Sequence, residues 1–259
     1  MKYLFLLLAG FLMSSQIYSQ NLKTKKKISR FTKEVYQIDK KSKMKNGFYY
    51  KISKNSKDTL VVGNYLNGRK TGLWTYYKMN GEKYIEYNYS SKTINALYGE
   101  AHKSDSTYII RGNEFVLDKV DSPQIYLGFE NEGQMNIATS IKLPINIMEN
   151  NVTGRSIATF VVDEHGKMID QKIELSLNKE LDKKILDEIK KLEDNWIPAK
   201  KNGKAISSKI IFTLNVNNSS PNKQEANLKK ELPYMWQAEL AYSSVVRTRK
   251  VISRRRMSY

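Results

Sequence analysis

Short runs in which apolar and polar residues alternate fill the stretch from Gly47 to Asp118. Alternation with a period of two predicts β-strands that bury one face. The pairs Asn67-Gly68 and Asn80-Gly81 separate three of these runs. Asn-Gly between alternating runs favours a hairpin, because both central residues of a type I′ turn need a positive φ. Residues 47–118 are therefore predicted to form an antiparallel β meander.

A second pattern covers Gly154 to Val216 and predicts a small β-β-α-β unit. Residues 155–163 are apolar on both faces, which predicts a central strand, and residues 168–175 return after a turn at Glu164–Lys167. Asn178 is a plausible N-cap for a helix over Lys179–Leu192, whose apolar residues form one stripe. The last strand, Ile206–Val216, alternates and is expected to point Ile210, Phe212, Leu214 and Val216 inward.

This last strand carries the functional argument, because a strand that follows the helix is expected at the edge of its sheet. An edge strand has free N–H and C=O groups and can accept an extended peptide as an added strand. The lysines at 200, 201, 204 and 209 would favour an acidic partner segment. The candidate peptide-binding residues are Ser207, Ser208, Lys209, Ile210, Ile211, Phe212, Thr213 and Leu214.

The segments outside these two patterns are less regular. Residues 20–46 read as a basic lead-in, either a flexible linker or a short amphipathic helix, because Phe31, Val35 and Ile38 have helical spacing. A helix is predicted over Glu132–Leu143, and Pro144 ends it. Residues 218–259 form a basic tail, of which the part from Pro233 to Tyr242 is apolar enough to pack or to bind.

The N-terminus has the layout of a secretory signal peptide. Lys2 precedes an apolar run from Tyr3 to Met13, and a polar stretch ends at Ser19. A membrane span needs about 20 apolar residues, and this run is shorter. We predict a signal over residues 1–19 and export to the periplasm or the periplasmic face of the outer membrane. The alternative, an uncleaved N-terminus, would anchor the chain in the inner membrane.

The composition supports a folded binding protein and gives no sign of an active site. The chain has 259 residues, 40% hydrophobic, with no cysteine and two histidines. His102 lies in a polar stretch with no carboxylate at metal-ligand spacing, and His165 ends the turn Asp163-Glu164-His165, whose residues suit the shape of the backbone. No phosphate-binding loop or nucleophile motif occurs. We predict no catalytic residue, no metal and no cofactor; an enzyme is the least supported alternative.

The net charge of +18 is concentrated in the two flanks. Residues 21–46 hold ten Lys/Arg and two acidic residues, and residues 220–259 hold nine and three. An exported protein rarely meets nucleic acid, so we exclude that partner. Anionic lipid or lipopolysaccharide is the charged partner that such flanks would meet in the envelope. Solvated flanks with no specific partner are the alternative.

The unit Gly63-x-Tyr65-x-Asn67-Gly68-x-Lys70-x-Gly72-x-Trp74-x-Tyr76-Tyr77 resembles the MORN-type repeat of YwqK-family antitoxin-like proteins. One copy is complete, and the segments around it look like degraded copies. The resemblance implies a scaffold in which aromatic side chains stack across neighbouring strands. The alternative is a ligand groove on the repeat aromatic face, which consists of Tyr65, Trp74 and Tyr76.

Residues 121–217 resemble the C-terminal domain of TonB proteins. The resemblance rests on Pro144, Gly154, Phe160–Asp163, Gly166-Lys167, Leu181, Trp196–Ala199, Asn202–Lys204 and the closing strand. It implies that Ser207–Val216 pairs with the short TonB box of outer-membrane receptors. An energy-transducing TonB keeps an inner-membrane helix and a long proline-rich spacer, whereas this chain has five prolines. We therefore expect binding without the motor connection.

These observations predict an α+β fold, in which an antiparallel meander of MORN-like hairpins precedes a small β-β-α-β TonB C-terminal-like domain. The combination resembles exported proteins of Bacteroidetes-type bacteria. The predicted function is non-enzymatic binding of an outer-membrane receptor or another envelope protein, in connection with TonB-linked transport. The alternative is an adaptor that holds envelope components through its aromatic meander and basic flanks. The predicted parts are 1–19, 20–46, 47–118, 121–217 and 218–259.

Overall fold

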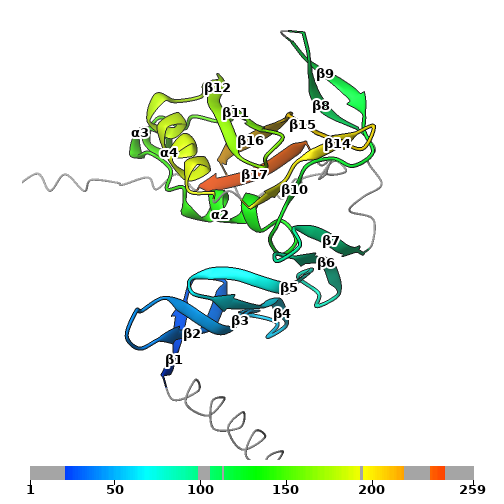
Figure 1. Ribbon diagram of the computed structural model, residues 1–259. Helices are drawn as coiled ribbons and strands as arrows, with labels where there is room; N and C mark the ends of the chain where they lie inside the picture. The colour runs from blue at the N-terminus through cyan, green and yellow to red at the C-terminus, as the bar shows by residue number, and fades with distance from the viewer. Residues whose placement is uncertain (1–20, 99–105, 113, 193–194, 219–233, 243–259) are drawn as a thin grey trace, which may run out of the picture. The chain divides into compact units, whose positions relative to one another are not determined.

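The computed structural model describes residues 21–98, 106–112, 114–192, 195–218 and 234–242 (Figure 1). The expected signal peptide, His102 and the arginine-rich end of the tail lie outside these residues. Antiparallel strands dominate the described part, with three helices among them, so the α+β prediction is confirmed. The chain divides into two compact units that interleave along the sequence. The expected domain boundaries remain predictions.

The larger unit comprises Met1–Gly133, Val161–Ile169 and Glu193–Lys209. It contains a seven-stranded sheet in which each strand pairs with the next one along the chain. All the neighbouring strands are antiparallel, so the predicted meander is present from Gly47 to Leu97, whereas the rest of the predicted stretch belongs to another sheet. The strands are β1 (Leu22–Ile28), β2 (Thr32–Asp39), β3 (Lys45–Ser53), β4 (Thr59–Leu66), β5 (Arg69–Tyr77), β6 (Lys83–Asn88) and β7 (Thr93–Leu97).

The meander begins earlier than predicted, because β1 and β2 replace the linker or helix expected before Gly47. Val35 and Ile38 are both buried, although they lie three residues apart on β2. The register with β3 shifts between Tyr36 and Ile38, which marks a β-bulge. The extra residues of this irregularity lie on β3, where residues 46–48 face a single residue of β2, and β2 pairs with β1 without a shift. Val35 and Ile38 therefore lie on opposite faces of a regular strand, and the apparent helical spacing arises because each face contains a buried residue.

The two Asn-Gly pairs behave differently in the turns. At the β4–β5 turn, Asn67 has φ 48° and Gly68 has φ 81°, as a type I′ hairpin requires. After β5, Gly81 has φ 84° while Asn80 does not have a positive φ. The N–H of Lys78 donates to the carbonyl of Glu82 at 2.8 Å and closes a longer loop. The type I′ prediction holds for the first pair only.

The same unit holds three small strand pairs. Residues 106–118, predicted to continue the meander, instead lie in a hairpin of β8 (Ser106–Arg111) and β9 (Glu114–Lys119) that belongs to the sheet of β16. β10 (Ile125–Tyr126) pairs with β13 (Trp196–Ile197), and the rings of Tyr126 and Trp196 meet edge to face at 5.0 Å. β14 (Ala199–Lys201) and β15 (Lys204–Ile206) form a hairpin at Asn202-Gly203. The Gly166 turn lies so close to Trp196 that an added Cβ would come within 2.3 Å of the Trp196 carbonyl oxygen.

The smaller unit comprises Gln134–Phe160, Asp170–Leu192 and Ile210–Tyr259. Its strands follow the order β12-β11-β16, and β17 pairs with β16. β11 is thus central, as its two apolar faces predict. The elements are α2 (Glu132–Ser140), α3 (Ile145–Glu149), β11 (Gly154–Val162), β12 (Met168–Leu175), α4 (Lys179–Lys190), β16 (Ser208–Asn218) and β17 (Met235–Tyr242).

The helix α4 is held at its start and along one face. The side-chain oxygen of Asn178 accepts hydrogen bonds from the N–H groups of Glu180 at 3.0 Å and Leu181 at 3.1 Å, so the predicted N-cap is present. Leu181, Ile185 and Ile189 are fully buried. The carboxylate of Asp182 accepts hydrogen bonds from the hydroxyls of Ser156 on β11, at 2.9 Å, and of Ser176. These contacts tie α4 to the sheet.

Candidate strand-addition site and aromatic face

The strand β16 separates its side chains as the sequence predicts. Ile210, Phe212, Leu214 and Val216 are each 0% exposed. The residues between them, including Ile211 and Thr213, are partly exposed. One face of the candidate strand therefore belongs to the core, and the other is reachable from solvent.

The backbone sides of β16 are both occupied, which differs from the expected edge position. β11 precedes β16 in the sheet order on one side. On the other side, Ser208 and Lys209 pair with β8, and the stretch from Ile211 to Asn218 pairs with β17. The difference arises because the chain beyond the β-β-α-β unit returns to the sheet as another strand. Figure 1 shows β17 running beside β16.

β17 pairs with β16 in parallel, in a register that places Phe212 opposite Trp236. The N–H of Ile211 donates to the carbonyl of Tyr234 at 2.8 Å. Tyr234, Trp236 and Tyr242 are buried on alternate positions. The alternation was visible in the apolar stretch before Tyr242, and it is the signal that could have identified this strand.

The beginning of the candidate strand is held by polar contacts. The hydroxyl of Ser207 donates to the Glu164 carboxylate at 2.9 Å. Hydrogen bonds from its own backbone N–H and from Ser207 hold the pKa of Glu164 below its usual value. The hydroxyl of Ser208 is buried and makes no hydrogen bond within the described part of the chain. The ammonium of Lys209 lies 5.3 Å from the centre of the Phe115 ring.

The four lysines expected to favour an acidic partner have different surroundings. Lys201 binds the Asp118 carboxylate at 2.6 Å, and this hydrogen bond lowers the pKa of Asp118. Lys209 lies over an aromatic ring, as described above. Lys200 and Lys204 are exposed on the β14–β15 hairpin. An acidic segment would therefore meet Lys200 and Lys204 first.

The repeat aromatic face lies inside the seven-stranded sheet's core. Trp74 is 1% exposed and Tyr76 is 2% exposed, whereas Tyr65 is partly exposed. The Trp74 ring stacks on Tyr49 at 5.3 Å and meets Tyr65 edge to face at 5.1 Å. Of the three residues expected to line a groove, Tyr65 is the one that solvent reaches.

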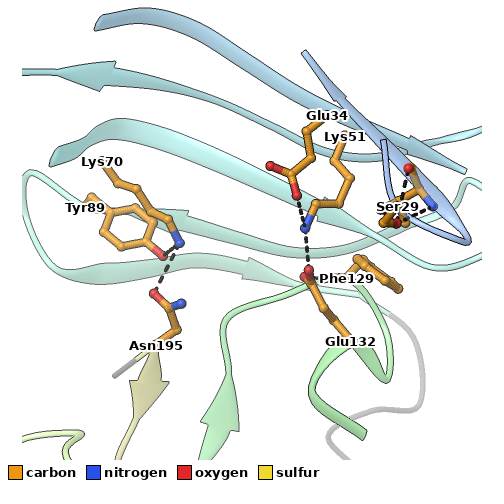
Figure 2. A network of polar contacts seen from close by, with 9 residues as sticks. Ser29, Glu34, Lys51, Lys70, Tyr89, Phe129, Glu132 and Asn195 are labelled. Atoms are coloured by element: carbon orange, nitrogen blue, oxygen red, sulfur yellow. Dashed lines mark hydrogen bonds and ion pairs between the residues drawn. The ribbon is translucent and has the colours of Figure 1, made fainter. Parts of the chain in front are cut away.

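Lysines on this face are a feature that the sequence analysis missed. The ammonium of Lys51 forms ion pairs with the carboxylates of Glu34, at 3.6 Å, and Glu132, at 2.5 Å (Figure 2). The same view shows Lys70, whose ammonium donates to the Tyr89 hydroxyl at 3.1 Å and to the Asn195 side chain at 3.2 Å. The sequence could have indicated these lysines, because Lys51 and Lys70 stand at alternate positions from aromatic residues on the same strands.

A third lysine, Lys45, shows how the face accommodates charge. Its ammonium lies 4.9, 5.4 and 4.8 Å from the ring centres of Tyr36, Tyr49 and Tyr65. Aromatic faces attract a cation and partly replace its hydration. The network around Lys51 works differently: burial opposes its charge, but the attraction of Glu132 and Glu34 is stronger and raises the pKa of Lys51. These lysines are held in place as part of the sheet.

The described residues contain no group of three or more potential metal ligands. His165 is exposed in its turn, with its ring nitrogen 3.9 Å from the Glu164 carboxylate. In the same part of the chain, no helix combines the length and the apolar character needed to cross a membrane.

Residues 139–217 match a family model described as the Gram-negative bacterial TonB protein C-terminal. The match runs from the end of α2 to the end of β16, and it supports the resemblance drawn from the motifs in that region. No curated protein and no solved structure matches the chain. The matched family consists of protein-interaction domains of the bacterial envelope. Fold and match together indicate an α+β module with a TonB-type protein-binding role in the envelope.

Proposed function

We propose that this protein binds an extended segment of an outer-membrane receptor, or of another envelope protein, by strand addition at β16. The proposed stretch is the expected run from Ser207 to Leu214, in which Ser208 and Lys209 pair with β8 and Ile211 is the first position that pairs with β17. Chain export and TonB-linked transport are parts of the same proposal.

One observation supports the strand-addition site most directly. The side of β16 that faces away from β11 accepts a parallel strand over the whole stretch from Ile211 to Asn218. Because alternate residues of a strand direct their backbone groups to the same side, Thr213 and Asn215 share the orientation of Ile211. Main-chain pairing of this kind gives affinity that depends little on the partner's sequence.

Proline at Ile211 tests the proposal, since it removes the N–H that bonds toward this side of β16. The probe is a set of synthetic TonB-box peptides, and binding is measured by fluorescence anisotropy on the full chain. We expect Ile211→Pro to lose binding while Ile211→Val keeps it. Proline at Lys209 is less informative, because Lys209 pairs with β8.

Circular dichroism shows whether the Ile211→Pro chain is still folded. Thr213→Pro, which removes the next N–H on the same side, repeats the test at a second position. Equal peptide binding by the wild type and by both folded proline variants would rule out strand addition at β16.

The second candidate function, an envelope adaptor, is favoured by the exposed cations of β1. Lys23, Lys25, Lys26 and Lys27 are all exposed, and β1 is the first strand of its sheet. We propose anionic lipid or lipopolysaccharide as the partner of this strand. The adaptor role predicts binding to anionic vesicles that Ile211→Pro leaves unchanged, which separates it from peptide binding.

A further inference from the structure

The side of β16 assigned to partner binding is filled by a segment of this same chain. β17 pairs with β16 at every position from Ile211 to Asn218. Trp236 and Tyr242 of β17 are buried, as is Tyr234 just before it, whereas Glu239 and Ala241 are exposed. The side of β16 that pairs with β17 therefore accommodates an extended segment with one apolar face.

The contacts of β17 are specific along its whole length. The Trp236 ring meets Phe160 of β11 edge to face at 5.9 Å. The hydroxyl of Tyr242 donates to the Val152 carbonyl at 3.0 Å. Between these anchors, the side-chain amide of Asn217 donates to the Glu239 carboxylate at 2.6 Å. Aromatic anchors at both ends and one polar contact between them fix the register.

We propose that β17 is a resident ligand of β16, and that a partner segment binds in parallel by replacing it. This inference rests on the proposed function. The contacts of β17 also define the partner: an extended segment with large apolar side chains at alternate positions, an aromatic one of them opposite Phe212. The receptor segment therefore competes with β17 for the same backbone groups.

Competition with a tethered strand sets the strength of binding. β17 and β16 belong to one chain, and linkage within one chain corresponds to an effective concentration on the order of 1 mM. For a segment whose intrinsic Kd is about 10 µM, an internal competitor of equal affinity raises the apparent Kd about a hundredfold. A substitution that weakens the pairing of β17 should therefore lower the apparent Kd of the partner segment by up to this factor.

A labelled peptide with the sequence Tyr234–Tyr242 tests the inference without any receptor. We expect the wild-type full chain to bind it weakly and the Trp236→Ala chain to bind it about tenfold or more tightly, because the internal competitor has lost its anchor on Phe160. Gln237→Ala, at the adjacent position on the other face of β17, is the matched control and should behave as the wild type. Equal binding by the wild type and Trp236→Ala would overturn the inference.

A disulfide between β16 and β17 gives a second test that does not depend on weakening the fold. The chain has no cysteine, and Thr213 lies opposite Gln237 in the register. The oxidised Thr213→Cys, Gln237→Cys protein should lose the capture of TonB-box peptides, and reduction of the same protein should restore it, whereas Gln237→Cys alone should bind equally with and without reductant. Capture by the oxidised form at full strength would contradict replacement of β17.

The two tests also separate this inference from the proposed function. Binding of the Tyr234–Tyr242 peptide by Trp236→Ala, without binding of any TonB-box peptide, would support β17 as a ligand of β16 and reject the receptor assignment. The reverse result, with TonB-box peptides bound equally by the oxidised and reduced proteins, would support the receptor and reject the replacement.

Discussion

Gly63 shows how a single residue sets the packing of the seven-stranded sheet. A Cβ at this position would lie 2.2 Å from Cδ2 of Trp74, so the ring lies directly on the glycine. Trp74 in turn donates its ring N–H to the Asn64 carbonyl at 3.1 Å. The absence of a side chain at position 63 is what lets the Trp74 ring lie flat across β4.

Gly63→Ala is therefore expected to lower the free energy of unfolding by about 2 kcal/mol, because the buried ring must move. Urea denaturation measures the loss. Asn64→Ala is the control, because its backbone carbonyl still accepts from Trp74, and a change within about 0.5 kcal/mol is expected. An unchanged urea midpoint for Gly63→Ala would contradict this expectation, because it would mean that the Trp74 ring can shift without loss of stability.

The buried phenol of Tyr49 leads us to expect that the protein loses stability at alkaline pH. Burial and the nearby Glu34 carboxylate raise its pKa far above the usual value of a tyrosine. The pKa in the folded state exceeds the unfolded value of about 10, so this contribution is complete below pH 10 and is lost as the pH rises further. Tyr76, raised mainly by burial, acts in the same direction.

The free energy of unfolding should thus fall between pH 10 and 11.5, and Tyr49→Phe should make that fall shallower by about 1.4 kcal/mol per pH unit. Guanidinium denaturation at several pH values measures the slope. Tyr50→Phe, at the adjacent and more exposed ring, is the control. Equal slopes for Tyr49→Phe and the wild type would show that the Tyr49 phenol is not protected by the fold.

At the scale of elements, α4 depends on its first turn. Asn178 caps the helix, and Asn178→Ala should lower the free energy of unfolding by about 1 kcal/mol, because two backbone N–H groups lose their acceptor. Asn178→Asp should retain most of the stability, since a carboxylate accepts the same hydrogen bonds. Thermal denaturation measures both variants. An Asp variant as unstable as the Ala variant would show that the cap contributes through something other than its oxygen.

Several elements could be predicted because their local patterns agree with their tertiary place. The alternation around Asn67-Gly68, the stripe of α4 and the two apolar faces of β11 each point to one structure. β2 could not, because its buried residues Val35 and Ile38 are three positions apart on opposite faces of the strand, which imitates helical spacing. β17 was visible as an apolar segment, but a parallel partner across residues 219–233 is a long-range pairing that local pattern does not reveal.

At the candidate site too, some features could be predicted from the sequence and others could not. Burial alternates along β16 as predicted, because side-chain direction follows from the period of a strand. Its backbone neighbours were not predictable, because they depend on which distant strands reach it. The aromatic face was recognised from its spacing. Its lysines were missed because Lys51 depends on Glu132, far along the chain, for its charge partner.

At the scale of the whole molecule, four of the lysines that contribute to the net charge of +18 lie on β1, in the part of the chain that is described. Among the described strands, β1 pairs with β2 alone, so β1 is an edge strand of that sheet. Lysines at an edge oppose pairing with another strand, because like charges would be brought together. The same lysines remain available to an anionic surface, where each contributes about 1 kcal/mol.

Binding to vesicles that contain anionic lipid should therefore depend on β1 and on salt. Replacing Lys23, Lys25, Lys26 and Lys27 by glutamine should weaken binding at least tenfold, and the matched arginine replacements should retain it, because they keep the charge. Raising the ionic strength from 0.1 to 0.5 M shortens the screening length to roughly 4 Å and should release the wild type. Vesicle sedimentation measures both effects. Unchanged binding by the glutamine variant would place the attraction elsewhere and leave the lysines of β1 with the single role of keeping the sheet edge unpaired.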